Sequence, residues 1–158
     1  MQLIEAIKFR RSIRAFTQQP IAEADLQSII ECGMYAPSAR NQQAWEFFIL
    51  QSPEKKQWLG ETLKNGKHQV MINQANTIIF TGFRQANLQA PEFIQQDMGA
   101  CVQNMLLAAH DKGLGACRIG IYPLHHQDHS LNILLHLSEE ITLFNAIVLG
   151  YPDPTLPL

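Results

Sequence analysis

The sequence has few cysteines, no long hydrophobic run and no large excess of charge of either sign. Its three cysteines are an odd number whose spacing matches neither a zinc site nor a disulfide framework, so we interpret Cys32, Cys101 and Cys117 as reduced core residues. No apolar run approaches about 18 residues, and no charged segment followed by an apolar core opens the chain, which predicts a cytoplasmic protein without a membrane span. The formal net charge of -2 gives no reason to expect nucleic acid or an anionic membrane as a partner.

The bulk composition is that of an ordinary globular chain. A hydrophobic content of 46% over 158 residues is enough to build a core, so we predict a single domain over residues 1–158. Helical spacing and cap residues predict helices that begin near residues 3, 21, 52, 66, 91 and 131, the longest covering 91–113. Apolar runs without that spacing predict strands at 45–51, 77–81, 116–121 and 143–149.

Two further expectations concern how these segments are used. We expect the strand at 45–51 to be buried on both faces, and the polar segment 84–90 to be mobile. Strands and helices mix without strict alternation. This mixing favours an α+β domain with one central, mostly antiparallel sheet flanked by helices.

Three arginines and a serine are concentrated near the start of the chain. Arg10 and Arg14 can each offer a bidentate guanidinium fork, and Ser12 lies between them with a hydroxyl group. Such a donor set matches the oxygens of a phosphate monoester. A solvated basic turn at the end of a helix fits the spacing equally well.

A second motif turns this choice towards the phosphate. An Arg-Arg-Ser-x-Arg-x-Phe opening followed by Ala-Pro-Ser-x-x-Asn-x-Gln resembles the FMN-dependent nitroreductase family. Shorter matches follow in the family's order, in residues 97–100, 103–104, 106–109, 113–117 and 149–152. The resemblance implies a nitroreductase-like fold with three layers, in which helices cover both faces of the sheet.

The resemblance also implies where FMN binds, namely at the interface of a homodimer. Arg10 and Ser12 would bind the phosphate, and Arg14 would lie near N1 and O2 of the ring, where reduction leaves negative charge. The loop that contains Ser38 would come from the other subunit and cover the flavin, with Gln43 supporting that loop. The implied cofactor-binding residues are Arg10, Arg11, Ser12, Arg14, Pro37, Ser38, Ala39, Asn41, Gln69, Gly120, Ile121 and Tyr122.

Residues 117–122 match the family segment that runs under the isoalloxazine ring and supplies backbone N–H groups to N5 and O4. Pro123 has no N–H, so we expect the donor to be that of Tyr122. Gln69 falls where relatives supply a further polar group to the flavin. Relatives also usually continue well beyond the equivalent of Pro152, with an arm that wraps the partner, whereas this sequence stops six residues later. We therefore expect phosphate binding to rest on Arg10 and Ser12, and the dimer to be held by helix faces.

The implied activity is an oxidoreductase. NAD(P)H would reduce the flavin and leave, and a nitroaromatic, a quinone or a similar acceptor would then take the electrons from the same face by a ping-pong mechanism. No catalytic side chain and no metal are needed, because the cofactor carries the chemistry. The alternative is a flavin-binding protein without turnover, or a flavin-degrading enzyme of the same superfamily.

Two remaining features can be interpreted either as parts of a functional site or as ordinary structural residues. His125 and His129 would share a helix face, but no HExxH motif or cysteine accompanies them, so we interpret 125–129 as a polar surface loop. Phe83 and Phe93 fall near the expected site and are candidates for stacking on a substrate, although ordinary core packing is the commoner role for such residues.

Overall fold

The computed structural model describes residues 2–63, 66–123 and 130–155. The helices and strands, in chain order, are α1 (Leu3–Phe9), α2 (Glu23–Met34), β1 (Trp45–Leu50), α3 (Pro53–Thr62), α4 (Gly66–Gln74), β2 (Thr77–Arg84), α5 (Ile94–Asp111), β3 (Gly115–Gly120), α6 (Ser130–Leu134) and β4 (Ile141–Gly150). Every strand and helix that the sequence predicts is present, with boundaries that shift by a few residues. That residues 1–158 form one domain stays a prediction.

The four strands form one antiparallel sheet in the order β1-β2-β4-β3. This arrangement confirms the predicted α+β class. The two central strands are the most deeply buried. The expectation that the strand at 45–51 is buried on both faces is wrong, because β1 lies at an edge of the sheet, where only its end residues Trp45 and Leu50 are buried and Ile49 is 44% exposed.

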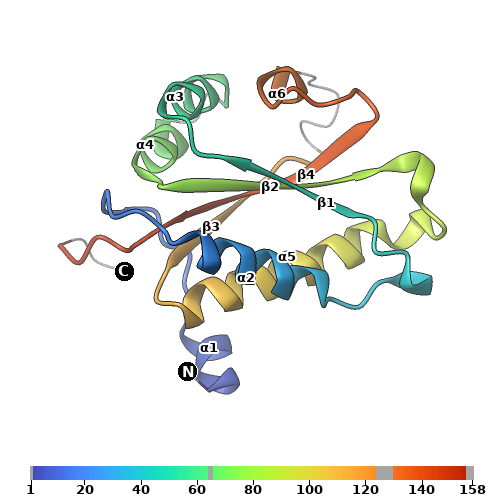
Figure 1. Ribbon diagram of the computed structural model, residues 1–158, viewed down its shortest axis with the longest axis horizontal. Coiled ribbons are helices and arrows are strands. Elements are labelled where there is room, and N and C mark those ends of the chain that lie inside the picture. The colour runs from blue at the N-terminus through green and yellow to red at the C-terminus, as the bar shows by residue number, and fades with distance from the viewer. Residues whose placement is uncertain (1, 64–65, 124–129, 156–158) are drawn as a thin grey trace.

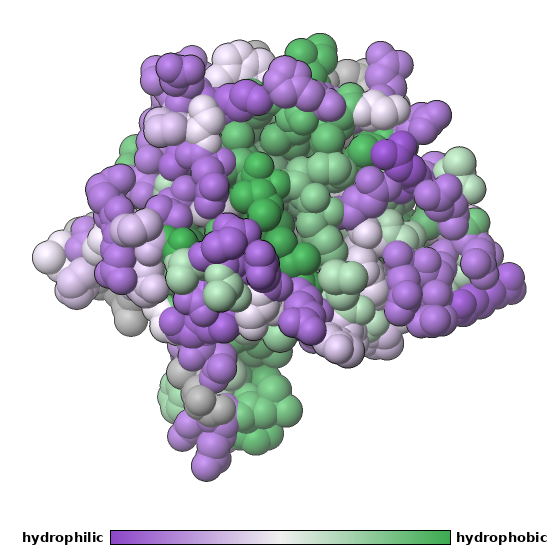
Figure 2. Space-filling model, viewed as in Figure 1, coloured by the Kyte–Doolittle hydropathy of each residue, from purple (hydrophilic) through white to green (hydrophobic). Residues whose placement is uncertain are grey.

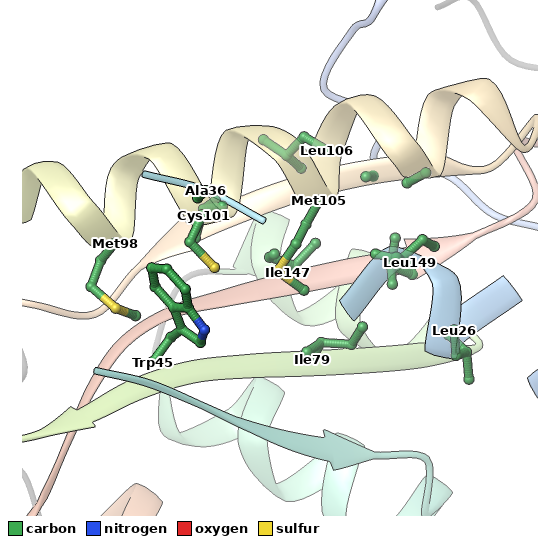
Figure 3. Packing of buried hydrophobic residues seen from close by; sticks show 14 of the residues in the cluster. Leu26, Ala36, Trp45, Ile79, Met98, Cys101, Met105, Leu106, Ile147 and Leu149 are labelled. Carbon is green, nitrogen blue, oxygen red and sulfur yellow. The ribbon is translucent and has the colours of Figure 1, made fainter. Parts of the chain in front are cut away.

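Helices cover both faces of the sheet, so the molecule has the three layers that the sequence predicts. Helices α2 and α5 lie against one face, and α3, α4 and α6 lie against the other (Figure 1). Each face has its own hydrophobic cluster. On the α5 face, Met98, Cys101 and Met105 point from the helix towards Ile79 and Ile147 of the central strands (Figure 3). Fully burying one such side chain contributes about 1.5–3 kcal/mol.

The long helix α5 begins and ends close to where the sequence places it. A 3-10 turn at Pro91–Phe93 precedes it, so the regular helix starts at Ile94 rather than at the proline. Gly113 has a φ of 73°, which confirms the predicted left-handed residue after the helix. Because β3 starts only two residues later, the first residues of β3 lie at the C-terminal end of α5.

The short helix α1 stands away from the rest of the molecule (Figure 1). Its apolar residues face solvent, with Leu3, Ile4 and Ile7 exposed by 67%, 58% and 53%. Figure 2 shows this hydrophobic surface on one side of the projecting helix. None of the helices in the described part of the chain has both the length and the apolarity that crossing a membrane requires.

Candidate functional site

The arginine-rich segment docks on the outer edge of β3. Ser12 forms a parallel β-bridge with Ala116, and the Ile13 N–H donates to the Ala116 carbonyl at 3.0 Å. The adjacent Gly115 makes this docking possible, because a Cβ there would lie 2.8 Å from the side chain of Ile13. Farther along, the Thr17 N–H donates to the Tyr151 carbonyl at 2.9 Å. The segment is thus fixed at both ends, with Ser12 and the flanking arginines held in place between α1 and the sheet.

The three arginines of this segment are not equivalent. Arg11 turns back and donates to the carbonyls of Lys8 and Arg10 at 2.7 and 2.9 Å, so it satisfies the C-terminal end of α1. Arg14 donates to the Ser12 carbonyl at 3.1 Å and remains exposed. Arg10 is half-buried. The geometry therefore favours Arg10 and Arg14 over Arg11 as anion ligands.

A fourth arginine, which sequence reasoning missed, joins this cluster. Burial raises the pKa of the Cys117 thiol, and the charges of Arg14, Arg10 and Arg118 oppose that rise, so all three charges act on this part of β3. The ion pairs among the described residues involve Arg84 and Lys112 instead. The sequence does contain a signal that could have identified Arg118: it is a charged residue between the two apolar residues Cys117 and Ile119 of a predicted strand.

The register of β3 decides which backbone groups face outward. Since the Ala116 carbonyl points away from β4 to accept from Ile13, strand alternation turns the N–H groups of Arg118 and Gly120 to the same outer edge. The N–H groups of Ile121 and Tyr122 both donate to the Phe144 carbonyl, at 3.1 and 3.0 Å. The expectation that the Tyr122 N–H is the available donor is therefore wrong, whereas the Gly120 N–H faces outward.

The residues present at this edge fit a phosphate-ended, planar ligand. Arg10, Ser12 and Arg14 supply hydrogen-bond donors and positive charge without a carboxylate partner in the described parts of the chain. At Gly120, a Cβ would meet nothing within 4 Å, so the face of the strand is open there. The donors at one end and the open backbone at the other match the two ends of a flavin mononucleotide.

The Pro37–Asn41 loop lies at the other end of α5. The Asp97 carboxylate, in the first turn of the helix, accepts from the Ala39 N–H at 3.0 Å and from the Gln42 side-chain amide at 2.6 Å. Gln42 in turn accepts from the N–H groups of Gln89 and Ala90, both at 3.1 Å. Gln42 therefore joins this loop both to Asp97 and to residues 89 and 90, a role that the sequence did not predict. Gln43 also supports the loop, as expected, through its backbone N–H. That the segment 84–90 is mobile stays a prediction.

The same loop carries an unusual backbone. Arg40, Asn41 and Gln43 have φ values of 51°, 54° and 45°, in the left-handed region that residues other than glycine rarely adopt. The Ser38 hydroxyl accepts from the Gln43 N–H at 3.1 Å and closes the turn. Backbone strain of this kind persists only where surrounding contacts enforce it, and it is common at ligand sites.

A shallow hollow of about 340 Å³ opens beside this loop. Its lining comes from the loop and from the N-terminal end of α5: Pro37, Ser38, Ala39, Phe93, Gln96, Asp97 and Ala100. Phe93 is 43% exposed here and can contact a ligand, whereas Phe83 is 1% exposed and packs against Tyr122 in the core. Of the two predicted aromatic candidates, only Phe93 is placed to meet a ligand.

The structure therefore separates the predicted site residues into two groups. From Asp97 to Asp111, α5 advances about 20 Å at 1.5 Å per residue, and this length lies between the loop and the arginine segment. In Figure 1 the loop after α2 is at the right-hand end and the segment after α1 is at the left. One chain alone does not bring its own loop to its own arginines.

Three other predictions have simpler outcomes. Gln69 lies on α4 with its stem packed against Gly60 of α3, and its role at a cofactor stays a prediction. Residues 125–129, with the histidine pair, lie outside the described residues. In the part of the chain that the structure describes, no group of three or more metal-ligating side chains is present, and the three cysteines are free, with Cys101 and Cys117 buried.

Comparison with known proteins matches these observations. The family model described as "Nitroreductase family" matches residues 7–66 and 56–151. A protein of Methanothermobacter thermautotrophicus, named for NADH dehydrogenase/NAD(P)H nitroreductase activity, is 34% identical over 96% of this chain and 78% of its own length. The NADPH-flavin oxidoreductase of Vibrio harveyi is 30% identical over 95% of this chain and 65% of its own length.

Solved structures show the same likeness in three dimensions. A nitroreductase from Desulfovibrio desulfuricans in complex with FMN superposes with a TM-score of 0.87 at 28% identity, covering 100% of this chain and 90% of that one. The chain described here belongs to the nitroreductase family.

Proposed function

We propose that this chain is an FMN-dependent oxidoreductase that takes electrons from NAD(P)H and passes them to nitroaromatic, quinone or similar acceptors, working as a homodimer by a ping-pong mechanism. The observation that carries the proposal is the pair of arginines, Arg10 and Arg14, that flank Ser12 on the segment docked at the edge of β3 and have no carboxylate partner among the described residues. The names of the relatives and the FMN in the Desulfovibrio structure support the choice of cofactor and reductant.

Each residue at the edge of β3 has a defined task in this proposal. Arg10 and Ser12 would hold the phosphate through charge-assisted hydrogen bonds, and the outward N–H of Gly120 would be a donor for the polar edge of the ring. Arg14 would stabilise negative charge on the ring. When bound, FMN supplies the electron transfer itself, so no side chain of this protein has to act as an acid, a base or a nucleophile.

In this proposal, the second group of site residues reaches the cofactor from another copy of the chain. The loop at residues 37–41 lies about 20 Å along α5 from the arginines of its own chain. A partner related by two-fold symmetry can bring its own loop over the flavin and leave one open face for both substrates. Because two substrates cannot share one slot at the same time, the mechanism is ping-pong.

The surface around α1 supports a dimer of this kind. An apolar hollow of about 420 Å³ lies between α1, α2 and α5, and Leu3, Tyr35 and Leu107 are among its lining residues. Tyr35 is 79% exposed, and the apolar residues of α1 continue this surface. Exposed apolar area of this extent is typical of a protein–protein contact. We infer that the α1 and α5 faces supply much of the dimer interface.

The activity is tested on the purified protein. A flavin absorption spectrum together with oxidation of NADH or NADPH is expected, and steady-state rates over a grid of both substrates should give parallel double-reciprocal lines. Intersecting lines would require a ternary complex and contradict the single slot. Bound flavin without oxidation of either nucleotide would favour a flavin-binding or flavin-degrading protein instead.

The dimer is tested by light scattering on paired variants. Ile4→Asp places a charge in the proposed interface on α1, and Ile133→Asp makes the same change at a residue that is 73% exposed on α6. We expect Ile4→Asp to weaken the dimer and Ile133→Asp to leave it intact. A wild-type monomer that binds FMN tightly would contradict both the interface and the two-subunit site.

A further inference from the structure

Arg118 is a charged side chain on a strand of buried residues, and the roles given above do not use it. Its neighbours Cys117 and Ile119 belong to the cluster on the α4 face of the sheet. Strand alternation therefore puts the side chain of Arg118 on the α5 face with Ala116, which is covered by the α5 cluster. Arg118 itself is exposed, as is Gly120 two residues on. The α5 layer thus covers the start of β3 and leaves its second half open.

The position of Arg118 along the strand places it between the two ends of the proposed flavin site. A β-strand advances about 3.3 Å per residue, so Arg118 lies about 7 Å beyond Ala116 and Gly120 about 13 Å beyond it. Ala116 is the residue that pairs with Ser12. A ligand with its phosphate at Ser12 and its ring edge at the Gly120 N–H must therefore pass beside Arg118.

The charges at this edge match those of the reduced cofactor. A phosphate monoester carries about -1.5 to -2 near neutral pH, and a flavin reduced by two electrons holds one further negative charge. Arg10 and Arg14 flank Ser12, which pairs with Ala116, and Arg118 lies two residues farther along β3. None of the three is paired with a carboxylate among the described residues. Oxidised FMN would leave about one of these positive charges uncompensated, whereas reduced FMN would not.

We propose that Arg118 lies against the flavin and binds the reduced, anionic cofactor more tightly than the oxidised one, so that it raises the reduction potential of the bound FMN. The inference rests on the proposed function. The phosphate charge is the same in both redox states, so a cation that served only the phosphate would stabilise both states equally. A cation beside the ring gains a Coulomb attraction only when the ring becomes negative.

The test uses Arg118→Met, which keeps the apolar stem and removes the charge, and Arg118→Lys, which keeps the charge. Lys55→Met is the matched control, because it also removes one positive charge but lies on α3, on the opposite face of the sheet. For each protein, the dissociation constant of oxidised FMN is measured by titration, and the midpoint potential of bound FMN by equilibration with a reference dye.

We expect Arg118→Met to weaken binding of reduced FMN about tenfold more than binding of oxidised FMN. For a two-electron couple, this ratio corresponds to a midpoint potential about 30 mV more negative. Arg118→Lys should recover most of the shift, and Lys55→Met should show none. Equal weakening of both redox states, or a potential unchanged from the control, would overturn the proposal.

The result for Arg118 can be distinguished from a failure of the proposed function. Wild-type protein and Lys55→Met bind FMN and reduce it reversibly if the proposed function is right, whatever Arg118 does. Failure of both proteins to bind FMN would reject the proposed function, and a difference confined to Arg118→Met concerns this inference alone.

Discussion

The two ends of α5 differ in whether their charged side chains have partners within the chain. At the C-terminal end, Arg10, Arg14 and Arg118 gather at the edge of β3 without a carboxylate partner in the described chain. At the N-terminal end, Asp97 is 6% exposed and both of its oxygens accept hydrogen bonds from the loop. The charges at the first end have no counter-charge among the described residues, whereas the carboxylate at the second end is satisfied within one chain.

This difference indicates that the two ends have different roles, one in binding a ligand and the other in shaping the site. A cluster of like charges raises the free energy of the empty protein and is relieved by a ligand of opposite charge, so the β3 edge is suited to binding. A loop held by a buried carboxylate keeps its shape with or without a ligand, so it is suited to forming a wall. The predictions below change one end at a time.

The largest effect is expected at Asp97. Asp97→Ala removes the acceptor for the Ala39 N–H and for one hydrogen of the Gln42 amide, and it should lower the free energy of unfolding by roughly 3 kcal/mol, because two part-buried hydrogen bonds to a charged group are lost. Urea denaturation measures the loss. Asp97→Asn keeps one acceptor oxygen and should lose less. Equal stability of Asp97→Ala and wild type would show that the loop is not held from α5.

A somewhat smaller effect is expected at the phosphate ligand. Arg10→Ala should weaken FMN binding by about 1.5–3 kcal/mol, or roughly 10- to 150-fold, because a charge-assisted hydrogen bond is lost. Its stability without ligand should be unchanged or higher, since one charge of the repelling cluster is removed. Flavin fluorescence titration and urea denaturation separate the two quantities. A destabilised variant with unchanged FMN affinity would reverse the roles assigned to the two ends.

The smallest effect concerns Lys56, a cation that is satisfied inside the fold. Its ammonium group donates to the Ala75 carbonyl at 2.6 Å, and burial lowers the pKa of Lys56 from its ordinary value of 10.5. Between the lowered pKa and 10.5, the folded state binds fewer protons than the unfolded state, so stability should rise with pH across that window. The free energy of unfolding is measured for wild type and for Lys56→Gln across this pH range, and the value for wild type should rise relative to that of the variant. A wild-type value that falls relative to the variant as the pH rises would contradict the lowered pKa of Lys56.

Much of the fold could be predicted from the sequence because helical spacing, caps and apolar runs are local signals. Ser52 caps α3 by accepting from the Lys55 N–H, and Gly113 takes the left-handed conformation after α5, both as expected. The exposure of β1 could not be predicted in this way. The residues Phe47 and Phe48 suit a buried strand, and only the order of strands in the sheet reveals that β1 is an edge.

The site was less accessible to sequence reasoning, because its parts depend on contacts between distant segments. The role of Gln42 in the loop depends on Asp97, which is more than 50 residues away along the chain. The choice between the N–H groups of Gly120 and Tyr122 depends on the register of β3 against β4. Arg118 joins Arg10 and Arg14 only once the N-terminal segment docks on β3.

The central claim is that the arginine edge of β3 recognises the phosphate of FMN, and the most direct test compares FMN with riboflavin, which has the same ring and no phosphate. Dissociation constants for both ligands are measured on the flavin-free wild type and on Arg10→Ala. The account predicts that wild type binds FMN at least about tenfold more tightly than riboflavin, and that Arg10→Ala removes most of that preference. Equal affinity of the wild type for the two ligands would contradict it.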